Sequence, residues 1–311
     1  ASLRASGCRM VYVDSGSTDG SVGLAHDLGT ESLLLDPAIP FTAARARNEG
    51  FRQLRANCPG LDYVQFVDGD CEILAGWIEA GARYLDAHSS VAAVCGRLRE
   101  KFPTRSVYNM LCDIEWHAPT GVTNACGGIA MMRVKSFEEV GGFRTDLIAG
   151  EEPELCVRLR SRGWIVFRLE ADMGVHDSAM FRFRQWWNRM MRGGYSFAQG
   201  AAIHGAPPER HRIRESRSAW IWGMGFPVLF MVLAIAWDPR ALLLFLIYPI
   251  QVIRLALRGK RTLRENWWHA GFLVLGKFPE MLGQLKYHLH RSTGKSGKLI
   301  EHKLPSSLDI T

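Results

Sequence analysis

The chain has 311 residues, of which 47% are hydrophobic and 22% are charged, so it can form a sizeable core and is not globally disordered. The net charge of +7 favours an anionic partner such as nucleotide phosphates, an acidic lipid surface or nucleic acid. Seven cysteines without a C-x-x-C spacing argue against a disulfide framework or a zinc site and favour a reducing, cytosolic environment. We recognise no N-terminal signal peptide.

A polar loop follows the first predicted strand, which covers residues 9–13. Residues 1–7 read as the end of a helix, with its start outside this chain. The loop contains Asp14, Ser15, Ser17 and Asp19, and a helix over residues 22–28 follows it. The order strand, acid, small polar loop, helix is typical of phosphate or nucleotide sites in α/β proteins. It is equally typical of a plain strand-to-helix loop, and this loop alone leaves both interpretations open.

A helix predicted over residues 43–58 carries basic side chains near its start. A short strand over residues 32–35 precedes this helix. Arg45, Arg47 and Asn48 lie in the first turns of the helix. They are placed to face a diphosphate or to face water, and the pattern favours water slightly.

Two carboxylates, Asp68 and Asp70, follow a buried strand predicted over residues 63–67, with only Gly69 between them. Hard oxygen ligands held this close suit Mg²⁺ or Mn²⁺, and such an ion in turn suits a diphosphate. The alternative is an Asp-Gly turn with solvated acids. A helix over residues 72–88 and a strand over 91–96 complete a β-α-β-α pattern, which predicts a mostly parallel sheet flanked by helices.

The middle of the chain has few clear periodicities over residues 97–123. Gly127 and Gly128 precede a strand predicted over residues 129–132, and paired glycines allow close approach of a bound sugar or phosphate. Ser136 and Glu139 have the spacing of a capping box, so we expect a short helix to start there.

Two glutamates lie at the entrance of the next predicted helix, over residues 153–162. Proline at position 153 makes Glu152 the expected N-cap. Glu151 or Glu152 could act as a general base for a hydroxyl nucleophile, although each could also simply complement the helix dipole. Further on, after another turn, His176 is either a structural histidine or a metal ligand.

The C-terminal part combines basic and apolar segments. Residues 183–194 are basic, aromatic and amphipathic, which suits a helix at a membrane surface or aromatic stacking on sugars. The apolar runs over residues 220–237 and 241–253 have arginine-rich flanks, which fits a membrane hairpin with both ends in the cytoplasm. The alternative is a buried hairpin of a soluble protein. We expect residues 272–289 to be interfacial.

Together these motifs resemble glycosyltransferase family 2. The resemblance rests on Val13–Ser21, Val67–Asp70, Gly127-Gly128 with Phe137–Phe143, and Gly150–Leu155, in this order, and it covers residues 9–195. It implies a GT-A fold and inverting transfer of a sugar from a nucleotide-diphosphate donor, with Mg²⁺ or Mn²⁺.

The resemblance also implies roles for individual residues. Glu152 matches the second acid of the family's base motif, here a glutamate in place of an aspartate, with Glu151 as the alternate base. Asp70 and His176 match metal ligands. The predicted donor-binding residues are Asp14, Ser15, Ser17, Asp19, Arg45, Asn48, Asp68 and Gly69. The predicted acceptor-binding residues are Gly127, Gly128, Trp186, Trp187 and Arg189. Residues 185–189 match the Gln-x-x-Arg-Trp motif of processive members only in a broken order.

These inferences give a predicted organisation. We expect a catalytic domain over residues 1–200 that lacks the family's first strand, a membrane-associated region over 201–290 with a hairpin over 219–257, and a polar tail over 291–311. The expected partners are a nucleotide-diphosphate sugar, a glycan or lipid-linked acceptor and the inner (cytoplasmic) membrane, but no nucleic acid. The expected role is transfer of a hexose in cell-envelope or exopolysaccharide synthesis. The alternatives are a sugar nucleotidyltransferase and an inactive membrane-anchored relative.

Overall fold

The computed structural model describes residues 7–294. The helix end predicted over residues 1–7 and the polar tail predicted over 291–311 therefore lie largely outside the described residues. The described chain forms two compact units, one of residues 7–102 and 112–179 and the other of residues 103–111 and 180–294. The domain limits expected near residues 200 and 290 stay predictions.

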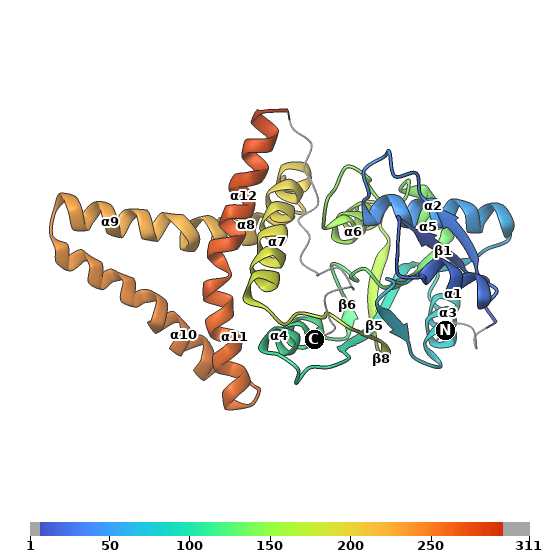
Figure 1. The fold of residues 1–311 in the computed structure, drawn as a ribbon, viewed down its shortest axis with the longest axis horizontal. Helices are drawn as coiled ribbons and strands as arrows, with labels where there is room; N and C mark the ends of the chain where they lie inside the picture. The colour runs from blue at the N-terminus through green and yellow to red at the C-terminus, as the bar shows by residue number, and fades with distance from the viewer. Residues whose placement is uncertain (1–6, 295–311) are drawn as a thin grey trace. The chain divides into compact units, whose positions relative to one another are not determined.

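The first unit contains both strands and helices (Figure 1). Its elements are β1 (Val11–Asp14), α1 (Ser21–Asp27), β2 (Glu31–Leu34), α2 (Ala43–Asn57), β3 (Tyr63–Phe66), β4 (Cys71–Ile73), α3 (Trp77–Ala87), β5 (Val91–Glu100), β6 (Gly121–Val122), β7 (Ala130–Arg133), α5 (Val134–Glu139), α6 (Glu151–Ser161) and β8 (Ile165–His176). The unit boundary passes through α4 (Val107–Trp116).

The strands form two sheets. β1 and β2 pair in parallel, and the larger sheet has the order β3-β7-β5-β8-β4, with β6 paired to β8. β5 and β8 are parallel, and β7 runs antiparallel between β3 and β5, so β3, β5 and β8 share one direction. β4 and β6 are short antiparallel additions to β8. The α/β class predicted from the sequence is confirmed, and the insertion of β7 is a feature that the β-α-β-α pattern did not reveal.

The core joins the sheet to α2 and α5 through aromatic rings. Phe51 of α2, Phe66 of β3, Phe137 of α5 and Phe143 are all buried. The ring centroids of neighbouring members lie 4.8–5.3 Å apart. Aromatic pairs in this range contribute beyond the area they bury. The cluster therefore fixes α2 against the end of β3, where the predicted carboxylates begin.

Several predicted helix starts were wrong. α6 begins at Glu151 with Gly150 as its N-cap, so Glu152 is not the cap. Gly150 has φ of 82°, a conformation that favours glycine. The prediction relied on the preference of proline for the first helical position, and Pro153 is instead the third residue of α6. α5 begins at Val134, and Ser136 inside it donates its hydroxyl to the carbonyl of Arg133 instead of forming a capping box.

Two further differences concern short elements. Residues 71–73 pair with β8 as β4, so the helix predicted over 72–88 begins only at Trp77. β8 continues without a turn from Ile165 to His176, whereas the sequence suggested a turn before the histidine. In both cases pairing between distant segments decides the structure, and local periodicity does not report it.

The second unit is helical. It contains part of α4 and α7 (Phe183–His204), α8 (Ile213–Trp220), the π-helical segment η2 (Ile221–Gly225), α9 (Phe226–Ala236), the 3₁₀ helix η3 (Pro239–Leu246), α10 (Ile247–Arg258), α11 (Leu263–Leu275) and α12 (Lys277–Ser292). The interfacial segment predicted over 272–289 is thus divided between α11 and α12. Figure 1 shows α7 and α12 side by side, and α9 and α10 as the two arms of a hairpin.

Glycines allow α7 and α12 to approach closely. A Cβ atom on Gly194 of α7 would lie 1.9 Å from the carbonyl oxygen of Glu280, and one on Gly283 of α12 would lie 2.0 Å from that of Met191. Gln284 is fully buried beside them, and the hydroxyl of Ser216 donates to its side-chain oxygen over 2.5 Å. Backbone contact through small residues is a usual way to pack helices in membranes.

Two continuous helical segments are long and apolar enough to cross a membrane. They cover Ile213–Ala236 and Pro239–Arg258, and only 17% and 6% of their apolar windows are buried within the structure. By length and composition they correspond to the predicted hairpin, and the low burial distinguishes them from core helices of a soluble protein.

The close packing predicts opposite results for two identical substitutions. Gly283→Ala should lower the thermal unfolding midpoint of the full chain in detergent, because its Cβ atom has no room beside Met191. Gly271→Ala in α11 meets no atom within 4 Å and should leave the chain unchanged or stabilise it by up to about 1 kcal/mol. Circular dichroism of the helical signal measures both. Equal midpoints for the two variants would contradict the packing.

Candidate active site

A buried arginine joins three of the acids in the first unit. The guanidinium of Arg47 donates to Asp68 Oδ1 over 2.7 Å and to Glu151 Oε1 over 2.8 Å, and it lies 2.9 Å from Glu152 Oε1. The side chains of Arg47, Glu151 and Glu152 are 10%, 6% and 15% exposed, whereas that of Asp68 is 42% exposed. We call these four residues the carboxylate cluster. It opens to solvent on the Asp68 side.

The helix α2 directs Arg47 into this cluster. Thr42 caps the helix by accepting from the amide of Arg45, which satisfies one amide that the first turn leaves free. Arg47 shares a face with the buried Ala44 and Phe51, which lie three positions before it and four after it, so the packing of that face turns Arg47 inward. Its guanidinium carbon also lies 5.5 Å from the centroid of the Phe143 ring.

Gly128 forms the wall opposite Arg47. A Cβ atom at this position would lie 2.8 Å from Arg47 Nη2, 2.8 Å from Glu152 Oε1 and 3.0 Å from Asp68 Oδ2. A side chain at position 128 would therefore enter the cluster. The predicted need for glycine at a close approach agrees with this geometry, while the acceptor role of Gly127 and Gly128 stays a prediction.

The cluster shifts the ionisation of its members. Burial raises the pKa of Glu152 to about 7, with a further increase from Glu151 and an opposing effect from Arg47. Burial alone would lower the pKa of Arg47, but the surrounding carboxylates raise it, so the guanidinium stays charged. A carboxyl group poised near neutral pH can exchange a proton in either direction, which is the property of a general base.

Asp70 and His176 meet at the end of β8. His176 Nε2 lies 3.2 Å from Asp70 Oδ2, and the thiol of Cys71 donates to Asp70 Oδ1 over 3.4 Å. One ligand atom from each of these three residues lies within 4.8 Å of the others, so the group could hold a metal ion. The ring of Trp116 packs edge-on against the imidazole at 4.6 Å, which restrains its orientation.

The loop after β1 is organised around Asp14. This side chain is buried and accepts from the amides of Gly16 and Ser17 over 2.8 and 2.9 Å. Burial opposes its ionisation, but hydrogen bonds from Ser17 and Gly16 hold the pKa of Asp14 below its ordinary value. Asp14 is thus a negative charge at the carboxyl end of β1. Ser15, Ser17 and Asp19 of this loop are exposed, and their donor-binding roles stay predictions.

The side chains of Arg45 and Asn48 form hydrogen bonds with the backbone of the first unit. Arg45 donates to the carbonyls of Asp36 and Ile39 over 3.1 and 2.7 Å, which fixes the loop before α2. Asn48 exchanges two hydrogen bonds with the backbone of Phe143, at 2.7 and 2.9 Å. These bonds fix Phe143, whose ring in turn contacts the guanidinium of Arg47. The predicted contacts of Arg45, Asn48 and Gly69 with a nucleotide-sugar donor stay predictions.

The predicted aromatic acceptor residues belong to the second unit. Trp186 is only 2% exposed and packs edge-on against Phe272 at 4.7 Å, which is a structural role within that unit. Trp187 and Arg189 are partly exposed. Their contact with an acceptor stays a prediction.

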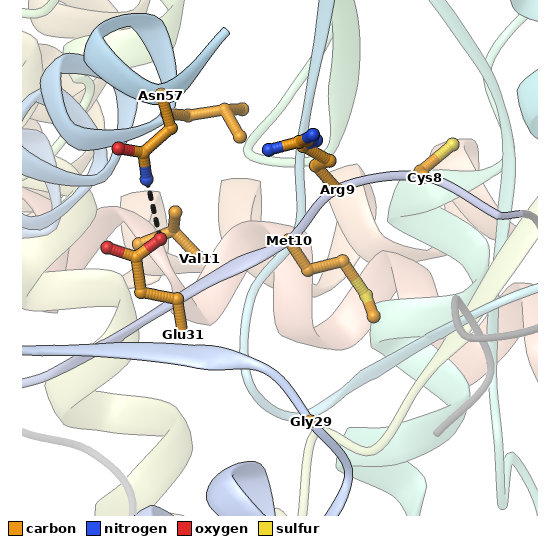
Figure 2. Close-up of a pocket in the computed structure, with 8 residues that line it drawn as sticks. Cys8, Arg9, Met10, Val11, Gly29, Glu31 and Asn57 are labelled. Carbon is orange, nitrogen blue, oxygen red and sulfur yellow. Dashed lines mark hydrogen bonds between the residues drawn. The ribbon is translucent and has the colours of Figure 1, made fainter.

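A pocket of about 340 Å³ lies elsewhere in the first unit, beside β1, β2 and α2 (Figure 2). Asn57 donates to Glu31 across it over 2.6 Å. Its lining consists of Cys8, Arg9, Met10, Val11, Gly29, Glu31, Leu54 and Asn57. It contains none of the predicted site residues, so it does not identify the site.

Sequence reasoning did not distinguish Arg47 from its neighbours, and it missed Cys71 as a member of the metal-binding group. Arg47 stood beside Arg45 and Asn48 in the sequence, and only the rotation of α2 shows that it is the residue that faces the acids. Cys71 followed Asp70 directly, but its proximity to His176 depends on the pairing of β4 with β8. The sequence offered one signal for both, since Arg47 is next to Asn48 and Cys71 is next to Asp70.

Comparison with known proteins identifies a family. The model described as glycosyl transferase family 2 matches residues 1–141, and the model described as glycosyl transferase family group 2 matches residues 74–257, more than half of the chain. No curated protein gives a significant match.

Comparison with solved structures finds one of similar fold among those it matches. The mannosyltransferase PcManGT from Pyrobaculum calidifontis, in complex with GDP-Man and Mn²⁺, is 20% identical with a TM-score of 0.58, and the match covers 89% of this chain and 77% of that one. TarS 1–349 from S. aureus, in complex with UDP, is 12% identical with a TM-score of 0.44, covering 92% and 82%. At these identities the first likeness shows a shared fold.

The carboxylate cluster predicts a large, pH-dependent cost for removing its cation. Arg47→Met should destabilise the chain by about 3 kcal/mol at pH 8, since it leaves buried carboxylates without a partner. The pKa of Glu152 is already above its ordinary value, so ionising it costs stability as the pH rises through about 7. Without Arg47 this cost grows, and the difference between variant and wild type should shrink at pH 5.

Urea unfolding followed by tryptophan fluorescence measures this cost. Arg144→Met is the matched control, because Arg144 pairs with Asp146 in an exposed bridge at 2.7 Å and should lose less than about 1 kcal/mol. If both variants lose the same amount at both pH values, Arg47 does not balance a buried charge cluster.

Proposed function

This chain belongs to glycosyltransferase family 2, nucleotide-sugar transferases of the GT-A fold, and on that premise we propose that it is a metal-dependent inverting hexosyltransferase. Its donor is a nucleotide-diphosphate sugar, and its acceptor is a hydroxyl group of a glycan or a lipid-linked glycan precursor. The observation that carries this proposal is the meeting of Glu152 and Asp68 at Arg47, where all three side chains come within about 3 Å of the place where a side chain at Gly128 would begin.

A divalent metal fits the residues at the end of β8. Asp70 offers a carboxylate oxygen and His176 an imidazole nitrogen, 3.2 Å apart. Oxygen and nitrogen donors of this kind suit Mn²⁺, and a carboxylate also suits Mg²⁺. When bound, such an ion supplies positive charge to a departing diphosphate as a Lewis acid.

Glu152 is the proposed general base. Its raised pKa lets it accept the proton of an acceptor hydroxyl near neutral pH. The hydroxyl oxygen then attacks the anomeric carbon from the face opposite the leaving group, so the configuration inverts in a single displacement. Arg47 holds Glu152 in place and remains charged throughout, and Glu151 shares the same guanidinium as the alternate base.

Asp68 and Asp14 are the proposed contacts of the donor. Asp68 is the most exposed member of the carboxylate cluster, and it follows the end of β3. Asp14 lies at the carboxyl end of β1 with its charge held by backbone amides. Carboxylates at strand ends are placed to accept hydrogen bonds from ribose or sugar hydroxyls.

The apolar helices support a membrane location. Residues 213–236 and 239–258 form the proposed hairpin, which would enter the inner membrane from the cytoplasmic side. Arginines lie just before its start and in its first turns, at positions 210, 212, 214 and 217, and basic residues lie at its end and just after it, at 258, 260, 261 and 264. Basic residues on both flanks favour cytoplasmic ends. A lipid-linked acceptor for envelope or exopolysaccharide synthesis accords with such a location.

Replacement of the proposed base separates chemistry from donor binding. Glu152→Gln should lower the rate of sugar transfer by at least about 100-fold, because an amide does not accept the proton. Binding of nucleoside diphosphate should change little. The measurement screens nucleotide sugars with Mn²⁺ and full-length protein and detects released nucleoside diphosphate. Glu138→Gln is the control, since Glu138 forms only an exposed pair with Arg55 at 3.0 Å.

The same assay gives a pH profile. The base works only when ionised, so kcat/KM should fall below a pKa near 7, about tenfold for each further pH unit. A wild-type rate that is flat from pH 5 to 8, or full activity of Glu152→Gln, would exclude Glu152 as the base.

Charges on the hairpin should weaken its hold on membranes. Val232 and Ile250 are 53% and 60% exposed and lie within the two spans. A lysine at such a position costs about 3 kcal/mol when placed at the centre of a membrane helix. The wild type should float with lipid vesicles, and the Val232→Lys/Ile250→Lys variant should not. Leu74→Lys in the first unit is the control, and flotation of all three would contradict insertion of the hairpin.

A further inference from the structure

We propose that Cys71 is the third protein ligand of the metal site formed by Asp70 and His176, so that the site prefers thiophilic divalent ions such as Zn²⁺ and Co²⁺ over Mg²⁺. This inference rests on the proposed metal site and adds to it a ligand and a selectivity.

The β4–β8 pairing places the thiol and the imidazole together. Cys71 and His176 are direct partners in this antiparallel ladder. Side chains of directly opposed residues project from the same face with Cβ atoms about 5 Å apart. The same register continues on the other side of β8, where His176 is opposite Glu100 of β5. The end of β8 that carries His176 is therefore held between β4 and β5. Strand pairing thus fixes the position of the Cys71 thiol beside the His176 imidazole.

Asp70 completes the set from the preceding residue. Its Oδ2 lies 3.2 Å from His176 Nε2, and its Oδ1 lies 3.4 Å from Cys71 Sγ. Its backbone carbonyl also accepts from the amide of Asp177 over 3.2 Å, which ties the end of this turn to the chain after β8. Three different donor atoms thus lie within 4.8 Å of one another on a backbone fixed by hydrogen bonds on both sides.

The donor set has a chemical preference. One carboxylate oxygen, one imidazole nitrogen and one sulfur are three ligands of the kind that bind Zn²⁺, with a fourth position left for a substrate oxygen. Sulfur selects soft ions, whereas Mg²⁺ takes oxygen ligands almost exclusively. A sulfur–metal bond forms as the Cys71 thiol gives up its proton to solvent, so the hydrogen bond to Asp70 is replaced by a shared ion.

Co²⁺ alone is the probe that tests this ligand. Added to the metal-free full chain, Co²⁺ should give a near-ultraviolet thiolate charge-transfer band together with visible ligand-field bands. Cys71→Ser should abolish the charge-transfer band and weaken Co²⁺ binding at least about 10-fold, with Mg²⁺ binding unchanged, because only the soft ion uses the sulfur. Cys58→Ser, at another partly buried free cysteine of this unit, should behave as the wild type.

Each other result overturns the proposal in a recognisable way. Visible bands without a thiolate band in the wild type would leave the metal site of Asp70 and His176 intact and remove Cys71 from it. A thiolate band that persists in Cys71→Ser would place Co²⁺ on other cysteines. No Co²⁺ binding in the wild type would reject this ligand and the metal site of the proposed function together. Circular dichroism of each variant verifies that the fold is retained.

Discussion

The buried ion cluster at Arg47 is the interaction on which the site depends. Three carboxylates from two distant segments of the chain converge on one guanidinium within 2.9 Å. Removing charges from water costs several kcal/mol for each ion, and only close, hydrogen-bonded partners offset that cost. The cluster therefore exists only because the surrounding packing holds α2, α6 and the end of β3 at fixed positions. The rings of Phe51 and Phe143, and the absence of a side chain at Gly128, provide that positioning.

The charge balance of the cluster accords with the proposed divalent ion at Asp70. One guanidinium faces Asp68, Glu151 and Glu152, and the raised pKa of Glu152 reflects the uncompensated negative charge as well as burial. A diphosphate that approached Asp68 would add more negative charge to the same region. A divalent ion at Asp70, two residues along the chain, is the simplest way to make that approach favourable. Binding of the proposed metal and of the donor would then depend on each other, and the pKa of Glu152, the proposed general base, would respond to both.

The sequence predicted most of the longer strands, the long helices and the carboxylates that follow strands, because these depend on local patterns. Strand-end carboxylates are visible as Asp14, Asp68 and Asp70, each after a short apolar run. The roles of Arg45 and Arg47 were not separable, because two positions along a helix differ by about 200° in direction and the packing of Ala44 and Phe51 decides which one faces the core. Pairing of residues 71–73 with residues 174–176 was also invisible, since it joins segments about one hundred positions apart. The left-handed Gly150 that begins α6 gave no signal distinct from other glycines.

The helical second unit combines tightly packed helices with helices whose large apolar side chains are exposed. Where α7, η2 and α12 meet, glycines at 194, 223 and 283 bring backbone atoms into contact, and Gln284 is fully buried with its hydrogen bonds made. This packing is specific and leaves no room for added side chains. Along α9, η3 and α10 the large apolar side chains are instead mostly exposed, from Val228 to Leu257. These exposed apolar side chains accord with the proposed membrane hairpin, because a bilayer solvates apolar side chains without specific contacts while the helices satisfy their own backbone hydrogen bonds.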